Sequence, residues 1–93
     1  MFYLYIIYSE SADKYYIGHT SDPGRRLFEH NNNPRMTFTH KYRPWVLKVS
    51  FPVSEMRSDA LRVERYIKKL KSRKFIEQLI IMKNINEIID QSV

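Results

Sequence analysis

The chain has 93 residues, a length that suits a single domain. It has no apolar run of about 18 residues, which excludes a membrane-spanning helix, and no cysteine, which excludes disulfides, thiol catalysis and thiolate zinc sites. Its 16 Lys and Arg residues outnumber 10 Asp and Glu, and the net charge of +6 is typical of a nucleic-acid binder or of ordinary solubility charge. The first residues lack the basic segment of a signal peptide, so we expect a cytoplasmic protein.

The first twenty residues predict a β-hairpin. Residues 2–9 and 15–20 are rich in aromatic and β-branched side chains, and a polar turn separates them. Because side chains alternate between the two faces of a strand, Tyr3 and Tyr5 should share one face, as should Tyr16 and Gly18 on the partner strand.

A helix and a third strand are predicted next. Asp22 can cap a helix that begins at Pro23 and runs to about Asn31, where an Asn-Asn-Asn-Pro sequence ends it. Residues 34–44 are expected to form a polar loop, and residues 45–51 a strand. One face of that strand should carry Trp45, Leu47, Val49 and Phe51.

The second half of the chain is predicted to be helical. Ser54 can cap a second helix that continues to about Ser72, Ser72 can cap a third over residues 73–82, and Asn84 or Asn86 could start a short fourth. The apolar stripe of the second helix is Ala60, Val63, Ile67 and Leu70. The order strand, strand, helix, strand, helix, helix predicts an α+β fold with helices packed on a small, mainly antiparallel three-stranded sheet. We expect one domain over residues 1–93, with its core in about 1–70 and C-terminal helices in about 73–91.

Three residues on these helices could carry chemistry. Arg26 and His30 lie four residues apart and share a face, which suits phosphate binding or merely a solvated helix face with His30 near its end. Glu64 lies beside the apolar stripe, where a carboxylate needs a partner or a metal. It could bind Mg²⁺ or pair with Lys68 four residues later, and spacing alone leaves both readings open.

The predicted hairpin is crowded with tyrosines, at positions 3, 5, 8, 15 and 16. Aromatic pairs stabilise sheets, so packing explains most of them. A tyrosine hydroxyl can instead serve as a general base if a neighbouring cation lowers its pKa. The sequence does not separate these roles.

Two basic segments could contact nucleic acid. Residues 57–74 carry eight cations, which could form a surface that follows the phosphates or only a solvated helix face. Residues 35–43 mix basic and aromatic side chains, as proteins that bind single strands do. The candidate contacts are His19, Arg25, Arg35, His40, Lys41, Arg43, Arg65, Lys68 and Lys69. The three histidines match no zinc-ligand spacing.

Taken in order, four features resemble the GIY-YIG nuclease domain: Tyr3-Leu4-Tyr5, Tyr16-Ile17-Gly18, Arg26 with His30, and a later Glu64 on a helix. The strongest part is residues 15–30, and the segments 41–44, 60–64 and 68–70 are also similar. The match looks closest to short stand-alone bacterial members. These in turn resemble the N-terminal nuclease domain of the incising component of the excision-repair excinuclease.

The resemblance implies a one-metal phosphodiester hydrolase acting on DNA with Mg²⁺ or Mn²⁺. Tyr5 and Tyr16 match tyrosines that flank the scissile phosphate, one of which helps to deprotonate the attacking water. Arg26 matches the arginine that stabilises the transition state, and Glu64 matches the sole carboxylate ligand of the metal. His30 matches a position often occupied by histidine near the phosphate or the base.

Some positions depart from the family pattern. The glycine and isoleucine of the first motif are Tyr3 and Leu4 here, which could narrow the entry to the site. Gly18 matches the second motif's glycine, where a missing side chain lets another element approach closely. His19 follows that motif. It could contact substrate or only pack where the chain leads into the following helix.

The expected activity is structure-directed DNA cleavage linked to repair or recombination, because no separate targeting domain follows the catalytic unit. Two alternatives remain. The chain could be a catalytically weak nucleic-acid-binding module, or a nuclease subunit that needs a protein partner or a second copy. In the latter case the apolar residues 75–89 could dock that partner, or they could simply complete the core.

Overall fold

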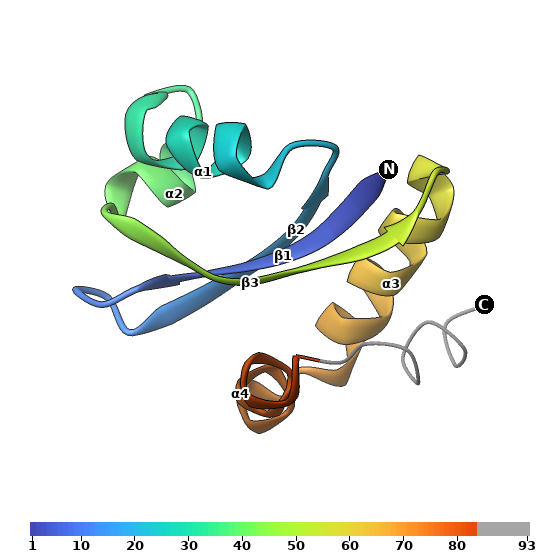
Figure 1. Ribbon diagram of the computed structural model, residues 1–93. Coiled ribbons are helices and arrows are strands. Elements are labelled where there is room, and N and C mark those ends of the chain that lie inside the picture. Colours follow the sequence, from blue (N-terminus) through green and yellow to red (C-terminus); the bar gives the residue numbers. More distant parts are fainter. Residues whose placement is uncertain (84–93) are drawn as a thin grey trace.

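The computed structural model describes residues 1–83. The elements follow the order β1 (Phe2–Ser9), β2 (Lys14–Thr20), α1 (Pro23–Asn32), α2 (Thr37–Lys41), β3 (Trp45–Ser54), α3 (Arg57–Leu70) and α4 (Arg73–Met82) (Figure 1). The predicted α+β class is confirmed. The helix predicted to start at Asn84 or Asn86 lies outside the described residues.

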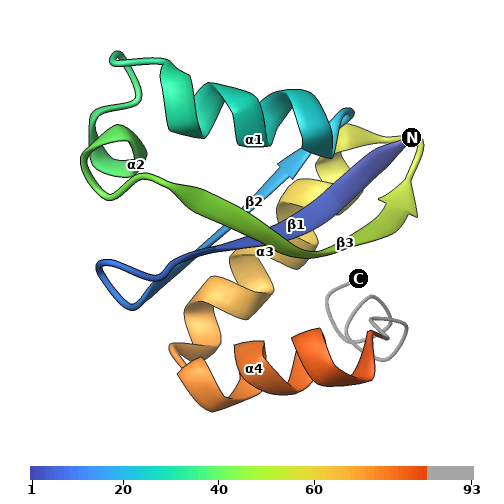
Figure 2. The same ribbon diagram turned by 60° about the vertical axis from the view of Figure 1, so that its left-hand side comes forward.

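The sheet forms the middle layer of the molecule. Its three strands are antiparallel in the order β2-β1-β3, so β1 is central and β2 and β3 are edges. Helices α1 and α2 cover one face, and α3 and α4 cover the other (Figures 1 and 2). None of the helices within residues 1–83 is long and apolar enough to cross a membrane.

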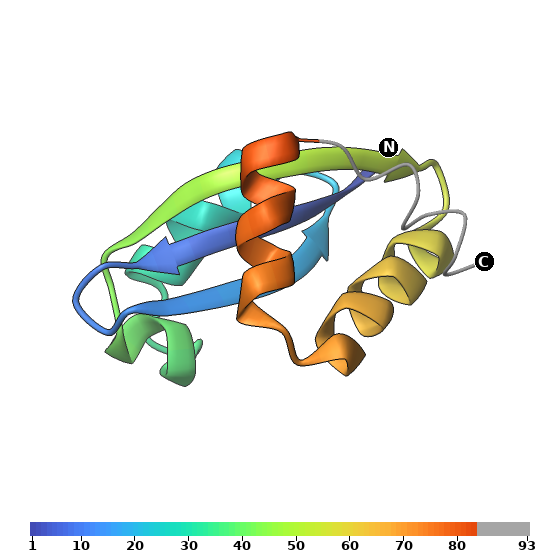
Figure 3. The same cartoon turned by 90° about the horizontal axis from the view of Figure 1, so that it is seen from below.

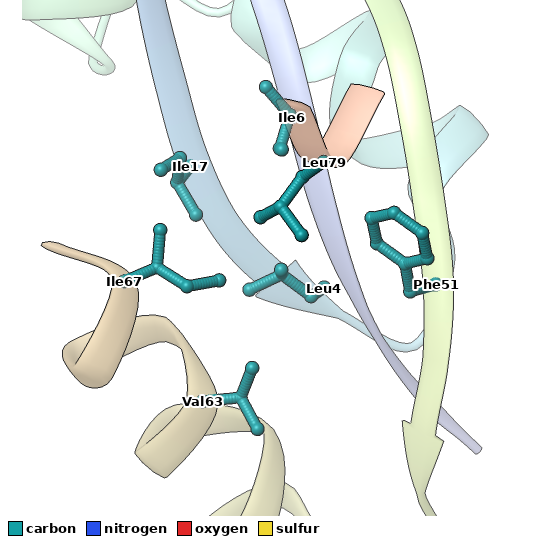
Figure 4. Packing of buried hydrophobic residues seen from close by; sticks show 7 residues of the cluster. All are labelled: Leu4, Ile6, Ile17, Phe51, Val63, Ile67 and Leu79. Atoms are coloured by element: carbon teal, nitrogen blue, oxygen red, sulfur yellow. The ribbon is translucent and has the colours of Figure 1, made fainter. Parts of the chain in front are cut away.

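The face toward α3 and α4 holds the larger apolar core. Leu4 and Ile6 of β1 are fully buried there, and the other members are Ile17, Phe51, Val63, Ile67 and Leu79 (Figure 4). Alternation along β1 sends these side chains to one face and Tyr5 and Ile7 to the other. Since α4 contributes Leu79 to this cluster, the described part of the C-terminal apolar segment completes the core.

The third strand changes face along its length, so the prediction of one apolar face is wrong. Trp45 and Leu47 pack with Tyr5 on the α1 side, whereas Val49 and Phe51 pack on the α3 side. The register against β1 shifts between Ile6 and Ile7, which indicates a β-bulge. One extra residue at a bulge reverses the side-chain alternation beyond it.

The segment 34–44 is not wholly a loop, because it contains the five-residue helix α2. This helix has no side-chain cap at its start, and its local sequence is polar, so propensity does not predict it. Tertiary contacts hold it instead. The indole Nε1 of Trp45 donates to the carbonyl of Thr39 at 2.6 Å, and Thr39 is buried.

Two details of α3 differ from the prediction. Ser54 is the last residue of β3 and does not cap α3, which begins after Met56. Ser54 instead accepts from the Met56 amide and donates to Asp59. Leu70 is 42% exposed and lies outside the buried stripe, because it falls in the last turn of the helix. Ser72 caps α4 as predicted, accepting from the Phe75 amide.

Candidate active site

The candidate site is built around the close approach of Tyr5 to Gly18. These residues pair across β1 and β2, and Tyr5 is only 2% exposed. A methyl group on Gly18 would lie 2.5 Å from the Tyr5 hydroxyl oxygen. The missing side chain therefore provides the space in which the Tyr5 ring lies, which agrees with the close approach that the family resemblance implies at this glycine.

His30 holds the hydroxyl of Tyr5 from the side of α1. It is fully buried, and its Nε2 lies 2.7 Å from the Tyr5 oxygen. Among the described residues its Nδ1 has no hydrogen-bond partner. Because an orphaned buried N–H is rarer than an orphaned acceptor, the tautomer with hydrogen on Nε2 is favoured, and His30 donates to Tyr5. His30 is thus part of the interior and not a helix-end surface residue.

The pKa values of this pair keep both groups uncharged at neutral pH. Burial, reinforced by the nearby Arg26 charge, lowers the pKa of His30 to about 4. Burial also raises the pKa of Tyr5 above its usual range, although Arg26 opposes the shift. Tyr5 therefore remains a protonated hydroxyl, and a neighbouring cation does not turn it into a ready base.

Arg26 lies one turn before His30 on α1, and the two side chains meet at the same tyrosine. Its guanidinium is within hydrogen-bonding reach of the Tyr5 hydroxyl. It also pairs with Glu29 at 3.2 Å and is 37% exposed. The Tyr5 hydroxyl therefore lies between His30 and the Arg26 guanidinium.

Glu64 approaches from the opposite face of the sheet, on α3. Its Oε1 lies 2.7 Å from Nδ1 of His19, and its Oε2 lies 2.9 Å from Nζ of Lys68. The Glu64 side chain is 14% exposed, whereas that of Lys68 is 49% exposed. The ion pair that the spacing allowed is therefore present, and His19 adds a second partner 45 residues away in the chain.

The donor set around Glu64 fits only a sparsely coordinated metal. Within residues 1–83, no three His, Cys, Asp or Glu side chains gather closely enough to hold an ion by themselves. Mg²⁺ often takes a single protein carboxylate and keeps waters and substrate phosphates as its other ligands. Lys68 is half exposed and can swing away, so the Glu64 carboxylate fits such an ion.

Tyr16 lies between these groups on the edge strand β2. Its ring packs edge-on against His30 at a centroid distance of 4.9 Å. The ammonium of Lys68 lies 5.6 Å from the same ring. Tyr16 therefore connects the Tyr5–His30 pair with the Lys68–Glu64 pair across the edge of the sheet.

A polar hollow adjoins Arg26. Three arginines, Arg25, Arg26 and Arg57, line it together with His19. Such a concentration of guanidinium groups suits phosphate oxygens. Arg57 is a candidate that sequence reasoning did not single out, because only the fold brings the start of α3 next to α1.

The remaining predicted nucleic-acid contacts are not all brought together. Arg35 lines a hollow beside Tyr16. The Arg43 side chain contacts the ring Nδ1 of His40 and donates to the His40 carbonyl. The Lys41 ammonium lies over the Tyr42 ring. Arg65 and Lys69 are exposed on α3.

Comparison with known proteins identifies close similarity to one family. A family model described as the GIY-YIG catalytic domain matches residues 1–77. The chain is 39% identical over 77 residues to a UPF0213 protein of Listeria monocytogenes, a match that covers 83% of this chain and 84% of that protein. It is 36% identical over 80 residues to a UPF0213 protein of Enterococcus faecalis, covering 84% and 88%. A UPF0213 protein of Listeria innocua is 44% identical over 64 residues, 69% of each chain. No solved structure matches the chain at a significant level.

Proposed function

The chain belongs to the GIY-YIG catalytic domain family, and on that basis we propose that it is a metal-dependent endonuclease that hydrolyses phosphodiester bonds in DNA. The observation that supports the proposal is the contact of both motif tyrosines with His30. Tyr5 bonds to His30 at 2.7 Å, and the Tyr16 ring lies against His30 at 4.9 Å. Arg26 lies one turn before His30 on α1, and Lys68 contacts both the Tyr16 ring and Glu64.

In this proposal Arg26 and Tyr5 bind the scissile phosphate. The Arg26 guanidinium is partly exposed and can donate to two non-bridging oxygens, whose negative charge grows in the transition state. Tyr5 remains protonated and donates its hydroxyl hydrogen to the same group. His30 acts as a positioning residue, because it fixes the Tyr5 oxygen without contacting substrate.

Tyr16 is the better of the two tyrosines for activating water. It lies at the edge of the sheet and lines two hollows, so solvent and substrate can reach it. Lys68 lies 5.6 Å from its ring. The water that attacks phosphorus would give its proton to the Tyr16 oxygen, while the Tyr16 hydroxyl would pass its own proton on to solvent.

Glu64 would hold the divalent cation, Mg²⁺ or Mn²⁺. When bound, such an ion acts as a Lewis acid and stabilises charge on the leaving oxygen. His19 would orient the Glu64 carboxylate through the 2.7 Å contact, as partners behind a ligand commonly do. Lys68 would withdraw from Glu64 as the ion arrives.

The finer parts of the proposal concern substrate and pathway. We expect the domain to act on branched or frayed DNA in the cytoplasm, in repair or recombination, as the resemblance to the excinuclease nuclease domain implies. The single-domain organisation over residues 1–93 belongs to the same proposal. A duplex sequence bound tightly and uniquely would contradict structure-directed recognition.

A second candidate function is a nucleic-acid-binding module with little activity. The observation that favours it is that both Glu64 oxygens are engaged, one by His19 and the other by Lys68. If these contacts are strong enough to exclude a cation, the basic surface binds nucleic acid without cutting it. A nuclease subunit that needs a partner would behave in the same way when tested alone.

Cleavage of a labelled DNA panel tests the proposal. The panel holds a single strand, a duplex, a flap, a splayed fork and a four-way junction, each with Mg²⁺ or Mn²⁺. Glu64→Ala and Arg26→Ala are compared with Glu55→Ala and Arg62→Ala, which change exposed residues paired elsewhere. Cleavage by wild type and both controls, with loss of about a hundredfold or more in the first two variants, supports the nuclease. Binding without cleavage supports the module, and equal rates in all five proteins contradict this site.

A further inference from the structure

Phe38 is an exposed aromatic ring on α2, beside the candidate site. It is 51% exposed, yet its ring is held in place by other rings. It packs edge-on against Tyr42 at a centroid distance of 5.2 Å and lies 6.4 Å from Tyr16. A fixed ring with one face open to solvent costs free energy in water and is available for stacking.

Three adjoining hollows follow the outer edge of β2, and Phe38 lines every one of them. Figure 3 shows the setting, with α2 and the turn between α3 and α4 on the side of the molecule where β2 is the outer strand. We call the combined hollows the Phe38 groove. The first contains Arg35, the second Lys68 and Ile76, and the third Lys14 and Arg73.

Each of the three hollows of the Phe38 groove has at least one basic residue in its lining. Its cations are Lys14, Arg35, Lys68, Lys71 and Arg73. Among the described residues that line these hollows, Asp13 supplies the one carboxylate, and it is paired with Arg73 at 2.6 Å. A ligand of this groove should therefore be anionic and should present a flat apolar face.

We propose that the Phe38 groove binds an unpaired nucleic-acid segment adjoining the scissile phosphate, with one base stacked on the Phe38 ring and the phosphates following the surrounding cations. A single strand offers a π-face at every base and a charge at every phosphate. The inference deepens the proposed function and rests on its nucleic-acid substrate.

Continuity with the candidate site favours nucleic acid over an acidic peptide as the occupant. Tyr16 and Lys68 belong to both the groove and the active-site cluster. A strand whose scissile phosphate reaches Arg26 would therefore extend along β2 and pass Phe38. A blunt duplex keeps its bases stacked on one another, so it offers none to the ring, and the groove distinguishes frayed from fully paired ends.

The test measures stacking directly with 2-aminopurine, a fluorescent base that is quenched when it stacks. Splayed forks carry the probe at successive positions of one arm, and binding is followed in EDTA so that no cleavage occurs. Phe38→Ala and Phe38→Leu remove the ring, whereas Phe38→Trp keeps an aromatic face. Phe28→Ala is the matched control, because Phe28 is 66% exposed on α1 and lines none of these hollows.

We expect quenching at one probe position in wild type, Phe38→Trp and the control, and its loss in Phe38→Ala and Phe38→Leu. The dissociation constant for the fork should rise about tenfold on loss of the ring, with no change for a blunt duplex. The Leu and Trp variants keep apolar bulk, so their comparison holds even if Phe38→Ala unfolds. Equal affinity and equal quenching with Leu and Trp would overturn the inference, as would displacement of the fork by an acidic aromatic peptide at a lower concentration.

The result of this test is independent of the result of the cleavage test of the proposed function. Cleavage that needs Glu64 and Arg26 but ignores the ring at position 38 would leave the nuclease standing and remove the groove. Stacking on Phe38 by a protein that never cuts DNA would do the reverse.

Discussion

Tyr5 and Gly18 face each other across β1 and β2, and the Tyr5 ring occupies the space that a side chain at Gly18 would need. A methyl group there would lie 2.5 Å from the hydroxyl and 2.7 Å from the ring carbon that bears it. Since Tyr5 is buried, the ring has little room to move. The position of the Tyr5 hydroxyl therefore depends on the absence of a Cβ in the neighbouring strand.

Gly18→Ala should consequently damage both the site and the fold. We expect the free energy of unfolding to fall by about 1–3 kcal/mol, the usual cost of overpacking, and cleavage to fall with it. Gly24→Ala is the control, because its nearest contact would be Asp22 at 3.7 Å, and alanine favours a helix. Urea denaturation of both variants checks this, and equal stability of the two would contradict the close approach.

His30 should make stability depend on pH. The unfolded chain binds a proton at this residue as the pH falls through about 6.5, whereas the folded chain resists until about 4. Stability is therefore present above pH 6.5 and is lost as the pH falls toward 4, by up to about 3 kcal/mol. His30→Gln removes this contribution, so its unfolding free energy should decline less steeply between pH 7 and 4.5. Parallel curves for the two proteins would show that His30 titrates normally.

Removal of the Tyr5 hydroxyl should cost activity more than stability. In Tyr5→Phe, His30 and Arg26 lose the oxygen to which they donate, which should lower the unfolding free energy by about 1–2 kcal/mol. The loss of a donor to the phosphate should slow cleavage about a hundredfold. Tyr8→Phe, in the same strand, removes an exposed bond to Asp13 and should cleave DNA at the wild-type rate.

Asn31 should contribute to stability through its bonds to β3. Its side chain accepts from the Trp45 amide at 2.6 Å and donates to the Trp45 carbonyl at 3.1 Å, which fixes the end of α1 to the sheet. Asn31→Ala should cost about 1–3 kcal/mol because both backbone groups lose a partner. Asn32→Ala removes only an exposed bond to Phe28 and should melt close to wild type.

Local patterns predicted the hairpin and the start of α1, because side-chain alternation and helix capping depend on neighbouring residues. The bulge in β3 has no such signature, so Trp45 and Leu47 were expected on the face of Val49. Helix α2 was missed for a related reason. A contact from Trp45 fixes it, and its own residues have low helix propensity.

The candidate site likewise contains some contacts that the sequence indicated and others that only the fold creates. Arg26 and Glu64 were found through a family resemblance, since spacing alone also allowed a solvated helix face for Arg26 and an ion pair with Lys68 for Glu64. The contact of His19 with Glu64 joins β2 to α3 across 45 residues of chain, so no local pattern reports it. Phe38 was seen only as one aromatic residue in a basic segment. Its place in the lining of three hollows depends on the fold, which brings residues of α2, β2, α3 and α4 to the same edge of the sheet.

We propose that Glu64 holds a divalent cation at a phosphodiester-cleaving site. The most direct measurement is the single-turnover cleavage rate of the best substrate as Mg²⁺ is titrated, in wild type and in Glu64→Gln, with Glu55→Gln as the control. Glutamine keeps the shape of Glu64 and can still accept from His19, so the fold should survive. We expect a saturable Mg²⁺ dependence in wild type and the control, and a rate at least about a hundredfold lower in Glu64→Gln. Equal rates and equal Mg²⁺ dependence in all three proteins would contradict it.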